Sequence, residues 1–215
     1  LQPGQAVSVD DLLRGLIVQS ANDAARVLAE AVAHHELAFV DRMNAEAKKL
    51  GLRDTHFANA SGVDEAGQYS SAHDLILLAA ALLREFPEFM PRYAERRFSY
   101  NGIEQYSHNR LLWLDPRADG LQTAFLESVG YSLLASAQSG QRRLLALVLG
   151  TPTEALRNSE SQRLLNYGFR EYESVLLYRK QQPVQTVPVW KGTRDNLNIG
   201  FAADLYVTIP LGTGS

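Results

Sequence analysis

The sequence contains no cysteine among its 215 residues, and lysine is scarce. The lack of cysteine excludes disulfides, thiolate metal sites and thiol nucleophiles, although it says little about the cellular compartment. The 21 basic residues include only four lysines, which are Lys48, Lys49, Lys180 and Lys191. No apolar run approaches the roughly 18 residues that a membrane-spanning helix needs. Thiol chemistry and a spanning helix are therefore excluded for these residues.

The charges nearly cancel, with 24 acidic residues and a formal net charge of −3 at pH 7. This balance implies no polyanion-binding surface, so we expect no nucleic-acid partner. Hydrophobic residues make up 46% of the chain and charged residues 21%, which is ordinary for a globular protein. The length allows one large domain, or one domain and part of another.

The two ends of the sequence have no features of a complete precursor. Leu1-Gln2-Pro3-Gly4 is neither a start methionine nor a signal peptide, so we expect the chain to begin inside a longer protein. Gly212-Thr213-Gly214-Ser215 has the composition of a flexible linker, either a natural loop cut short or an added segment. Any membrane association is expected to come from segments that are not present here.

Apolar residues recur at helical spacing through most of the first 90 residues. Ser8-Val9-Asp10-Asp11 and Ser71-Ala72-His73-Asp74 are capping signatures at the start of two predicted helices. A helix opens at Asn22-Asp23, and a further one is expected to end at Gly51. Pro87 and Pro91 should stop the helix that follows Ser71. We therefore predict a helical lobe over residues 1–95.

The pattern then changes to short strands. Asn101-Gly102 is a strong turn signal between strand-like segments at 98–100 and 103–106. Three further strands and a long helix are expected over residues 121–125, 130–137, 143–149 and 153–172. Past residue 175, valines and isoleucines are punctuated by proline, glycine and asparagine, which predicts a β-rich module. We predict a first domain over residues 1–174, with its sheet and helix part at 96–174, and the start of a second over 175–215.

Two short segments carry chemistry. Ser20-Ala21-Asn22 lies at the mouth of a predicted helix, and Gln122-Thr123-Ala124 lies at the start of a predicted strand. Taken alone, Ser20 or Asn22 could simply cap the helix, and the second segment could be an ordinary strand end. Together with Gly67 to Asp74, they resemble the active-site segments of the low-molecular-mass penicillin-binding proteins, the serine-type D-alanyl-D-alanine carboxypeptidases (peptidase S11 type). The resemblance runs nearly end to end.

The resemblance implies an α/β (α+β) fold of the penicillin-recognising serine transferase, or β-lactamase-like, type. Such a fold has an antiparallel sheet flanked by helices, a helical lobe and then a small β-rich domain. Family members remove the terminal D-alanine from peptidoglycan pentapeptides through an acyl-serine, use no cofactor and bind β-lactams covalently. They act in cell-wall biosynthesis and cell shape, in the bacterial periplasm or on its membrane face.

The resemblance also assigns roles to six residues. Ser20 would relay a proton to the leaving group, and Asn22 would bind the substrate amide. Gln122, Thr123 and Ala124 occupy the place of a Lys-Thr-Gly motif and depart from it at both outer positions. The glutamine keeps hydrogen bonding without charge, the alanine puts a methyl group where substrate backbone approaches, and Thr123 remains a hydroxyl donor.

Arg157 matches the arginine that the family places against the terminal carboxylate of the peptide. Arginine suits that role because its guanidinium can bind a carboxylate in a bidentate way. Without the resemblance, the same residue would be interpreted as a solvated helix position.

The acyl-serine reaction needs a serine with lysine three residues on, one helical turn away. No serine in this sequence has that neighbour. We expect the nucleophile-bearing helix and the first strands to precede Leu1, which would leave apolar faces open. That penalty is large against stabilities of about 5–15 kcal/mol. The chain alone is therefore predicted to be inactive.

Three functions remain open. The first is the carboxypeptidase, and the second is an inactive family member that binds peptidoglycan or a partner, favoured by Gln122 and Ala124. The third is a β-lactamase, which is disfavoured because no Glu-x-x-Leu-Asn-like segment is present to guide a deacylating water. His73 and Asp74 could join a serine in a triad, but no Gly-x-Ser-x-Gly elbow supports one.

The histidines give no metal signature, and we predict no metal site. His34 and His35 are adjacent and would diverge on a helix, while His56, His73 and His108 are scattered. Trp113 resembles part of a family segment near the active-site loop, although a tryptophan in such an apolar run is more often a core residue.

Overall fold

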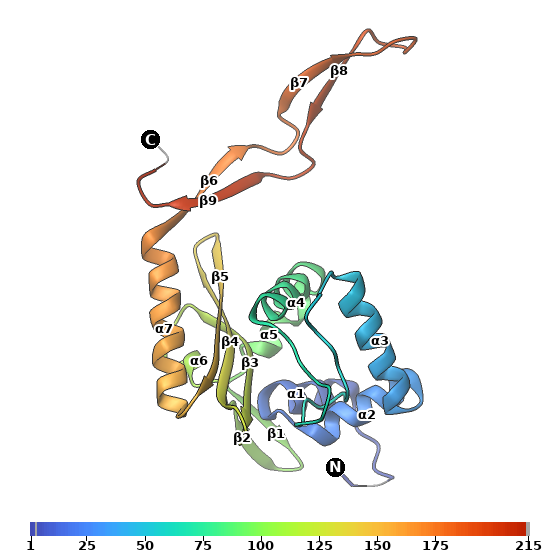
Figure 1. Ribbon diagram of the computed structural model, residues 1–215, viewed down its shortest axis with the longest axis vertical. Coiled ribbons are helices and arrows are strands. Elements are labelled where there is room, and N and C mark those ends of the chain that lie inside the picture. The colour runs from blue at the N-terminus through green and yellow to red at the C-terminus, as the bar shows by residue number, and fades with distance from the viewer. Residues whose placement is uncertain (3, 214–215) are drawn as a thin grey trace. The chain divides into compact units, whose positions relative to one another are not determined.

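The computed structural model describes residues 1–2 and 4–213 of the chain (Figure 1). The linker expected at the C-terminus lies partly outside these residues. The chain divides into two compact units, with residues 1–165 in the first and residues from 166 onward in the second. Helices and antiparallel strands both contribute, which confirms the predicted mixed fold class.

The first unit begins with a set of helices. Their bounds are α1 Val9–Gln19, α2 Asn22–Ala33, α3 Glu36–Lys49 and α4 Ala72–Glu85, followed by the 3₁₀ helix η1 Pro87–Phe89 and α5 Met90–Tyr93. Ser8 Oγ accepts a hydrogen bond of 3.0 Å from the Asp11 N–H, and Ser71 Oγ accepts one of 3.2 Å from the Asp74 N–H. Both predicted capping signatures therefore start helices, because a serine oxygen satisfies an otherwise unpaired N–H.

Two histidines separate α2 from α3. His34 ends α2 in the left-handed conformation, with a φ of 66°. The Nδ1 atom of His35 accepts a hydrogen bond of 3.1 Å from the Ala38 N–H and caps α3. The two histidines therefore lie between two helices rather than on one, and each has a structural role at the boundary.

The strands of the first unit form two antiparallel sheets. A hairpin pairs β1 Arg97–Tyr100 with β2 Ile103–Tyr106, around the predicted turn. The short helix α6 Leu111–Leu114 then leads to a three-stranded sheet in the order β3-β4-β5. The bounds of this sheet and of the helix after it are β3 Ala118–Leu126, β4 Gly130–Ser139, β5 Arg142–Thr151 and α7 Glu154–Glu171.

The core of the first unit lies along this sheet and the helices around it. Leu133 and Ala135 on β4 are fully buried, and so is Leu111 on α6. Helix α5 contacts β3, α4 contacts β5, and α1 contacts α2, α5 and the β1–β2 hairpin. These contacts fix the end of α1 relative to the edge strand β3, which is where the candidate site forms (Figure 1).

The second unit consists of two strand pairs. Strand β6 Tyr172–Tyr178 pairs with β9 Leu205–Pro210, and β7 Pro183–Pro188 pairs with β8 Asn196–Gly200. Every described residue from 166 to 213 is exposed or half-buried. Across the described residues of both units, no helix combines the length and the apolarity that crossing a bilayer requires.

Candidate active site

Ser20 lies at the junction of α1 and α2 in the left-handed backbone conformation. Its φ of 51° and ψ of 41° terminate α1. Non-glycine residues adopt this region at an energetic cost, and such residues cluster at functional sites. The N-cap of α2 is Ala21, and no side chain caps that helix. Neither Ser20 nor Asn22 caps α2 through its side chain, so the alternative that one of them caps the following helix is not supported; Ser20 is instead the C-cap residue of α1.

Gln122 on β3 reaches Ser20 across 102 positions of sequence. Its Nε2 atom donates a hydrogen bond of 2.9 Å to Ser20 Oγ. Because α1 packs against α5 and α5 packs against β3, the two short motifs come together in one place. Both partners are neutral, so the contact retains a hydrogen bond but carries no charge.

The other motif residues flank this contact. Asn22 is the first residue of α2 and is exposed. Thr123 is 8% exposed, whereas Ala124 is exposed on the strand. The Asn22 amide and the Thr123 hydroxyl make no hydrogen bond with other described residues. The exposed Asn22 amide is therefore available to a bound molecule, whereas the Thr123 hydroxyl is largely buried.

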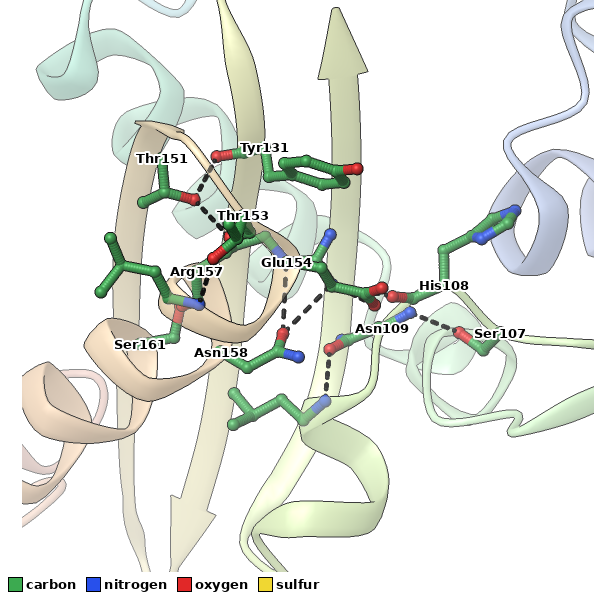
Figure 2. Close-up of polar contacts among 12 residues, drawn as sticks. Ser107, His108, Asn109, Tyr131, Thr151, Thr153, Glu154, Arg157, Asn158 and Ser161 are labelled. Carbon is green, nitrogen blue, oxygen red and sulfur yellow. Dashed lines mark hydrogen bonds and ion pairs between the residues drawn. The ribbon is translucent and has the colours of Figure 1, made fainter.

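Arg157 lies on the first turns of α7 and is only 2% exposed. Its Nη2 atom donates to the His108 carbonyl oxygen and to Glu154 Oε1, each at 3.0 Å. Its Nε atom donates to Asn158 Oδ1 at 3.2 Å (Figure 2). Burial lowers the pKa of Arg157, although arginine stays protonated in proteins. The residue is a buried, hydrogen-bonded cation and differs from the solvated helix residue that sequence alone suggests.

The surroundings of Arg157 connect it to the end of β3. Thr151 Oγ1 donates to the Tyr131 carbonyl oxygen at 3.1 Å, and Figure 2 shows both residues beside Arg157. Tyr131 pairs with Phe125, and their rings lie 4.5 Å apart. Phe125 is two positions beyond Thr123, a distance of about 7 Å along a strand. Arg157 thus lies at the end of the sheet toward which the Gln122 motif runs.

The partners of Arg157 were not identified from the sequence. Glu154 precedes it by three residues, a spacing that places both side chains on one helix face. The spacing of Glu154 and Arg157 was the one signal in the sequence for any of these contacts. His108 and Asn158 contribute a carbonyl oxygen and an amide oxygen, and neither contact has a sequence pattern.

Asp74 and His73 are in contact but form no triad with a serine. Asp74 is 1% exposed and accepts hydrogen bonds of 2.8 Å from the Asp54 N–H and from Thr55 Oγ1. Burial raises the pKa of Asp74, but hydrogen bonds from Thr55, Asp54 and His73 outweigh burial and lower the pKa below its ordinary value of 3.8. The carboxylate joins the loop before α4 to that helix, which is a structural role.

No cluster of three or more acidic or histidine side chains in the described residues could hold a metal ion. Trp113, expected in the core, is 39% exposed. The expectation was wrong because Trp113 is the third residue of a four-residue helix whose buried positions are Leu111 and Leu112.

The antiparallel sheet, with Ser20 hydrogen-bonded to Gln122 on its edge strand, agrees with the penicillin-recognising fold that the resemblance implies. The family model described as D-alanyl-D-alanine carboxypeptidase matches residues 1–153, and the one described as penicillin-binding protein 5, C-terminal domain, matches residues 172–214. The chain belongs to the D-alanyl-D-alanine carboxypeptidase family, which confirms the resemblance inferred from the motifs.

Curated relatives extend over the whole chain. D-alanyl-D-alanine carboxypeptidase DacA of Escherichia coli (strain K12) is 42% identical over 213 residues, which cover 99% of this chain and 53% of the relative. DacF of Bacillus subtilis (strain 168) is 36% identical over 196 residues, covering 89% of this chain and 50% of the relative. The chain therefore spans about half the length of the curated relatives that it matches.

Solved structures share the fold. Penicillin-binding protein 5 of Haemophilus influenzae superimposes with a TM-score of 0.92 at 36% identity, covering 100% of this chain and 63% of that one. Penicillin-binding protein D2 of Listeria monocytogenes, in its ampicillin-bound form, superimposes with a TM-score of 0.71 at 34% identity, covering 76% and 68%.

Proposed function

We propose that this chain forms the substrate-binding side of a serine-type D-alanyl-D-alanine carboxypeptidase that acts on peptidoglycan pentapeptides. The observation that carries the proposal is the 2.9 Å hydrogen bond from Gln122 Nε2 to Ser20 Oγ. It joins a serine in a strained backbone conformation to an edge strand along which an extended peptide can lie. A serine hydroxyl in this place can pass a proton between a base and a leaving amine.

The neighbouring groups supply peptide recognition. The Asn22 side-chain amide can bind a substrate amide, and the Thr123 hydroxyl can donate to the substrate carboxylate. Arg157 Nη1 donates to no described residue, whereas Nη2 and Nε are held by Glu154, Asn158 and the His108 carbonyl. The Nη1 nitrogen of this fixed guanidinium can donate to a terminal carboxylate, because its orientation is set before binding.

We place the acyl-forming serine outside these 215 residues, because no serine here is followed by lysine three positions on. Arginine does not substitute for that lysine, since its pKa keeps it charged. The chain would therefore supply walls of the pocket, and the nucleophile would come from other parts of the same protein. A periplasmic or cell-envelope location and β-lactam binding by the intact protein follow from the same proposal.

A second candidate function is a family member that binds the peptidoglycan stem without catalysis. Gln122 favours it, since the Ser20 contact contains no positive charge. Charge-assisted hydrogen bonds are roughly twice as strong as neutral ones. The neutral Gln122–Ser20 pair would still position a bound peptide, but it would stabilise an anionic intermediate less than a charged pair would.

Labelling with a fluorescent penicillin tests these alternatives on the full-length parent protein. The carboxypeptidase proposal predicts a covalent adduct that survives denaturation and release of D-alanine from a pentapeptide. Ser20→Ala should slow both reactions while leaving the thermal midpoint within a few degrees. Saturable pentapeptide binding with neither adduct nor release would instead establish the non-catalytic function. Rapid penicillin turnover would point to a β-lactamase.

A second measurement tests where the nucleophile lies. Intact-mass spectrometry of the isolated 215-residue chain after incubation with penicillin should show the unmodified mass. A penicilloyl adduct on the isolated chain would refute the placement of the acyl-forming serine outside it.

A further inference from the structure

An open groove of about 470 Å³ lies between α6 and the first turns of α7. Its walls include Arg110, Trp113 and Leu114 from the α6 segment, and Asn158, Ser159 and Gln162 from α7. None of these is among the six candidate active-site residues. All of them belong to the first unit, so the groove lies within one compact body.

One end of the groove is cationic and aromatic. The Arg110 guanidinium carbon lies 5.5 Å from the centroid of the Trp113 ring, and that of Arg96 lies 5.8 Å from it. No described carboxylate lies within ion-pair distance of either guanidinium. The contacts with the indole hold both cations in place. Two oriented guanidiniums without an acidic partner attract a carboxylate from outside.

The acid in the groove does not cancel this charge. Glu154 lines the same surface, but its Oε1 atom accepts a hydrogen bond of 3.0 Å from Arg157 Nη2. Its charge is therefore balanced by a buried arginine. The positive end made by Arg96 and Arg110 remains uncompensated among the described residues.

The α7 wall offers amide groups of the kind that bind a peptide backbone. Gln162 Nε2 donates to the Leu114 carbonyl oxygen at 3.1 Å, which leaves its Oε1 atom as a free acceptor. Asn158 Oδ1 accepts from Arg157, which leaves its Nδ2 atom as a free donor. The two residues are four positions apart and lie on one helix face. A donor and an acceptor on one wall complement the C=O and N–H groups of an extended peptide.

Exposed apolar side chains on the α6 wall indicate that a ligand of this groove also has an apolar side chain. Trp113 is 39% exposed and Leu114 is 55% exposed. Both lie beside the arginines in a groove of about 470 Å³. The methyl group of an alanyl residue would leave most of this apolar surface uncovered, whereas a leucyl or aromatic side chain would cover it.

We infer that the groove binds an acidic peptide segment of a partner protein. A carboxylate of that segment pairs with Arg110 and Arg96, and a large apolar side chain covers Trp113 and Leu114. Its backbone hydrogen-bonds to Asn158 and Gln162. This inference goes beyond the proposed function and does not depend on it, because the groove shares no candidate active-site residue.

The test uses the full-length parent protein and a blocked hexapeptide of alternating Asp and Leu. Calorimetric titration should give saturable binding that weakens with added salt, because exposed charges are screened. Arg110→Gln should weaken binding by about tenfold, the usual effect of losing one charge-assisted hydrogen bond.

Two controls isolate the groove. Arg163→Gln removes an arginine of α7 that is 76% exposed and paired with Glu160, and it should leave the affinity unchanged. The matching peptide of alternating Asn and Leu should bind at least tenfold more weakly than the acidic one. In the same calorimetric titration, Trp113→Leu should show loss of binding.

The inference is overturned if the acidic and neutral peptides bind alike, or if no saturable signal is found. Equal effects of the Arg110 and Arg163 substitutions would also overturn it, since binding would then follow overall charge. Competition by a peptide ending in D-Ala-D-Ala would reassign the groove to the substrate. Penicillin labelling of the parent protein should be unchanged by Arg110→Gln, which separates this inference from the proposed function.

Discussion

Gln122 and Ser20 form the contact on which the active-site argument depends. A lysine at position 122 could reach the same hydroxyl, so the glutamine preserves reach and removes charge. The contact is part-buried, and a neutral hydrogen bond of this kind contributes about 1 kcal/mol to stability. Its structural contribution and its electrostatic contribution to chemistry can therefore be measured separately.

The structural contribution is tested by a double-mutant cycle in the full-length parent protein. Ser20→Ala and Gln122→Leu should each lower the free energy of unfolding, and the double variant should cost less than their sum. The difference should be about 1 kcal/mol, because removing either partner already breaks the bond. Urea denaturation measures all four proteins. Strictly additive costs would show that the two side chains do not interact in solution.

The electrostatic contribution is tested by Gln122→Lys in the full-length parent protein. Restoring a cation beside Ser20 should raise the rate of penicillin acylation by about tenfold, the effect of roughly 1.4 kcal/mol on a barrier. Gln141→Lys in the β4–β5 turn adds the same charge at an exposed position and serves as the control. A rate that rises equally in both variants would attribute the effect to net charge.

Asp74 gives a pH-dependent prediction. Its folded-state pKa lies below the ordinary value of 3.8, so the unfolded chain binds a proton more readily. The stabilisation is therefore complete above about pH 4 and is lost as pH falls through the folded-state pKa. Asp74→Asn should lower the thermal midpoint by several degrees at pH 7 and by progressively less as the pH falls below about 4. Asp41→Asn, an exposed aspartate of α3, is the matched substitution. A deficit that does not change with pH would contradict this explanation.

At the scale of elements, local signals in the sequence were sufficient to locate a helix start or a turn wherever one residue type controls the backbone. Ser8 and Ser71 marked helix starts, because only a few side chains can satisfy the first free N–H groups. Asn101-Gly102 marked the β1–β2 turn, because both residues tolerate positive φ. Elements without such a residue, above all the four-residue helix α6, were not predicted.

Contacts between elements were harder to predict than the elements themselves. Family resemblance grouped Ser20 with Gln122, but nothing in the local pattern shows that Arg157 is buried against Glu154, Asn158 and the His108 carbonyl. Such contacts depend on how α7 packs beside the loop before α6. Periodicity reports which face of a helix is apolar and carries no information on its neighbour.

A further prediction concerns Gly130, which lies where β4 begins and β5 ends. It has a φ of +100°, and an added Cβ atom would lie 2.5 Å from the Thr151 carbonyl oxygen. Gly130→Ala should therefore displace Thr151, which hydrogen-bonds to Tyr131 beside Arg157. We expect a loss of about 2–4 kcal/mol in unfolding free energy, combining backbone strain with a steric clash.

The matched control is Gly140→Ala in the β4–β5 turn. Gly140 also has positive φ, at +59°, but its added Cβ atom would meet nothing within 4 Å. Only backbone strain of about 1 kcal/mol is expected there. Denaturant unfolding compares the two variants, and equal losses would show that the Thr151 contact is not tight in solution.

At the scale of the whole molecule, buried residues are distributed very unevenly. All the buried positions among the described residues lie between Leu12 and Leu165. The described residues from 166 to 213 form strand pairs with no buried side chain. Isolated two-stranded pairs are marginally stable in water, because they bury too little apolar surface to offset the entropy of ordering.

This distribution predicts two levels of backbone protection within one chain. In native-state hydrogen exchange, amides of β4 should exchange slowly, whereas those of β6–β9 should exchange nearly as fast as an unfolded peptide. Limited proteolysis should first cut beyond residue 171 and leave a resistant fragment that contains the first unit.

Leu133→Ala, which removes a fully buried side chain on β4, should accelerate exchange throughout the first unit, because cavity formation costs about 2–5 kcal/mol. It should leave β6–β9 unchanged, since strands that are already open have no stability to lose. Slow exchange in β6–β9 would require burial that the residues of this unit do not themselves provide.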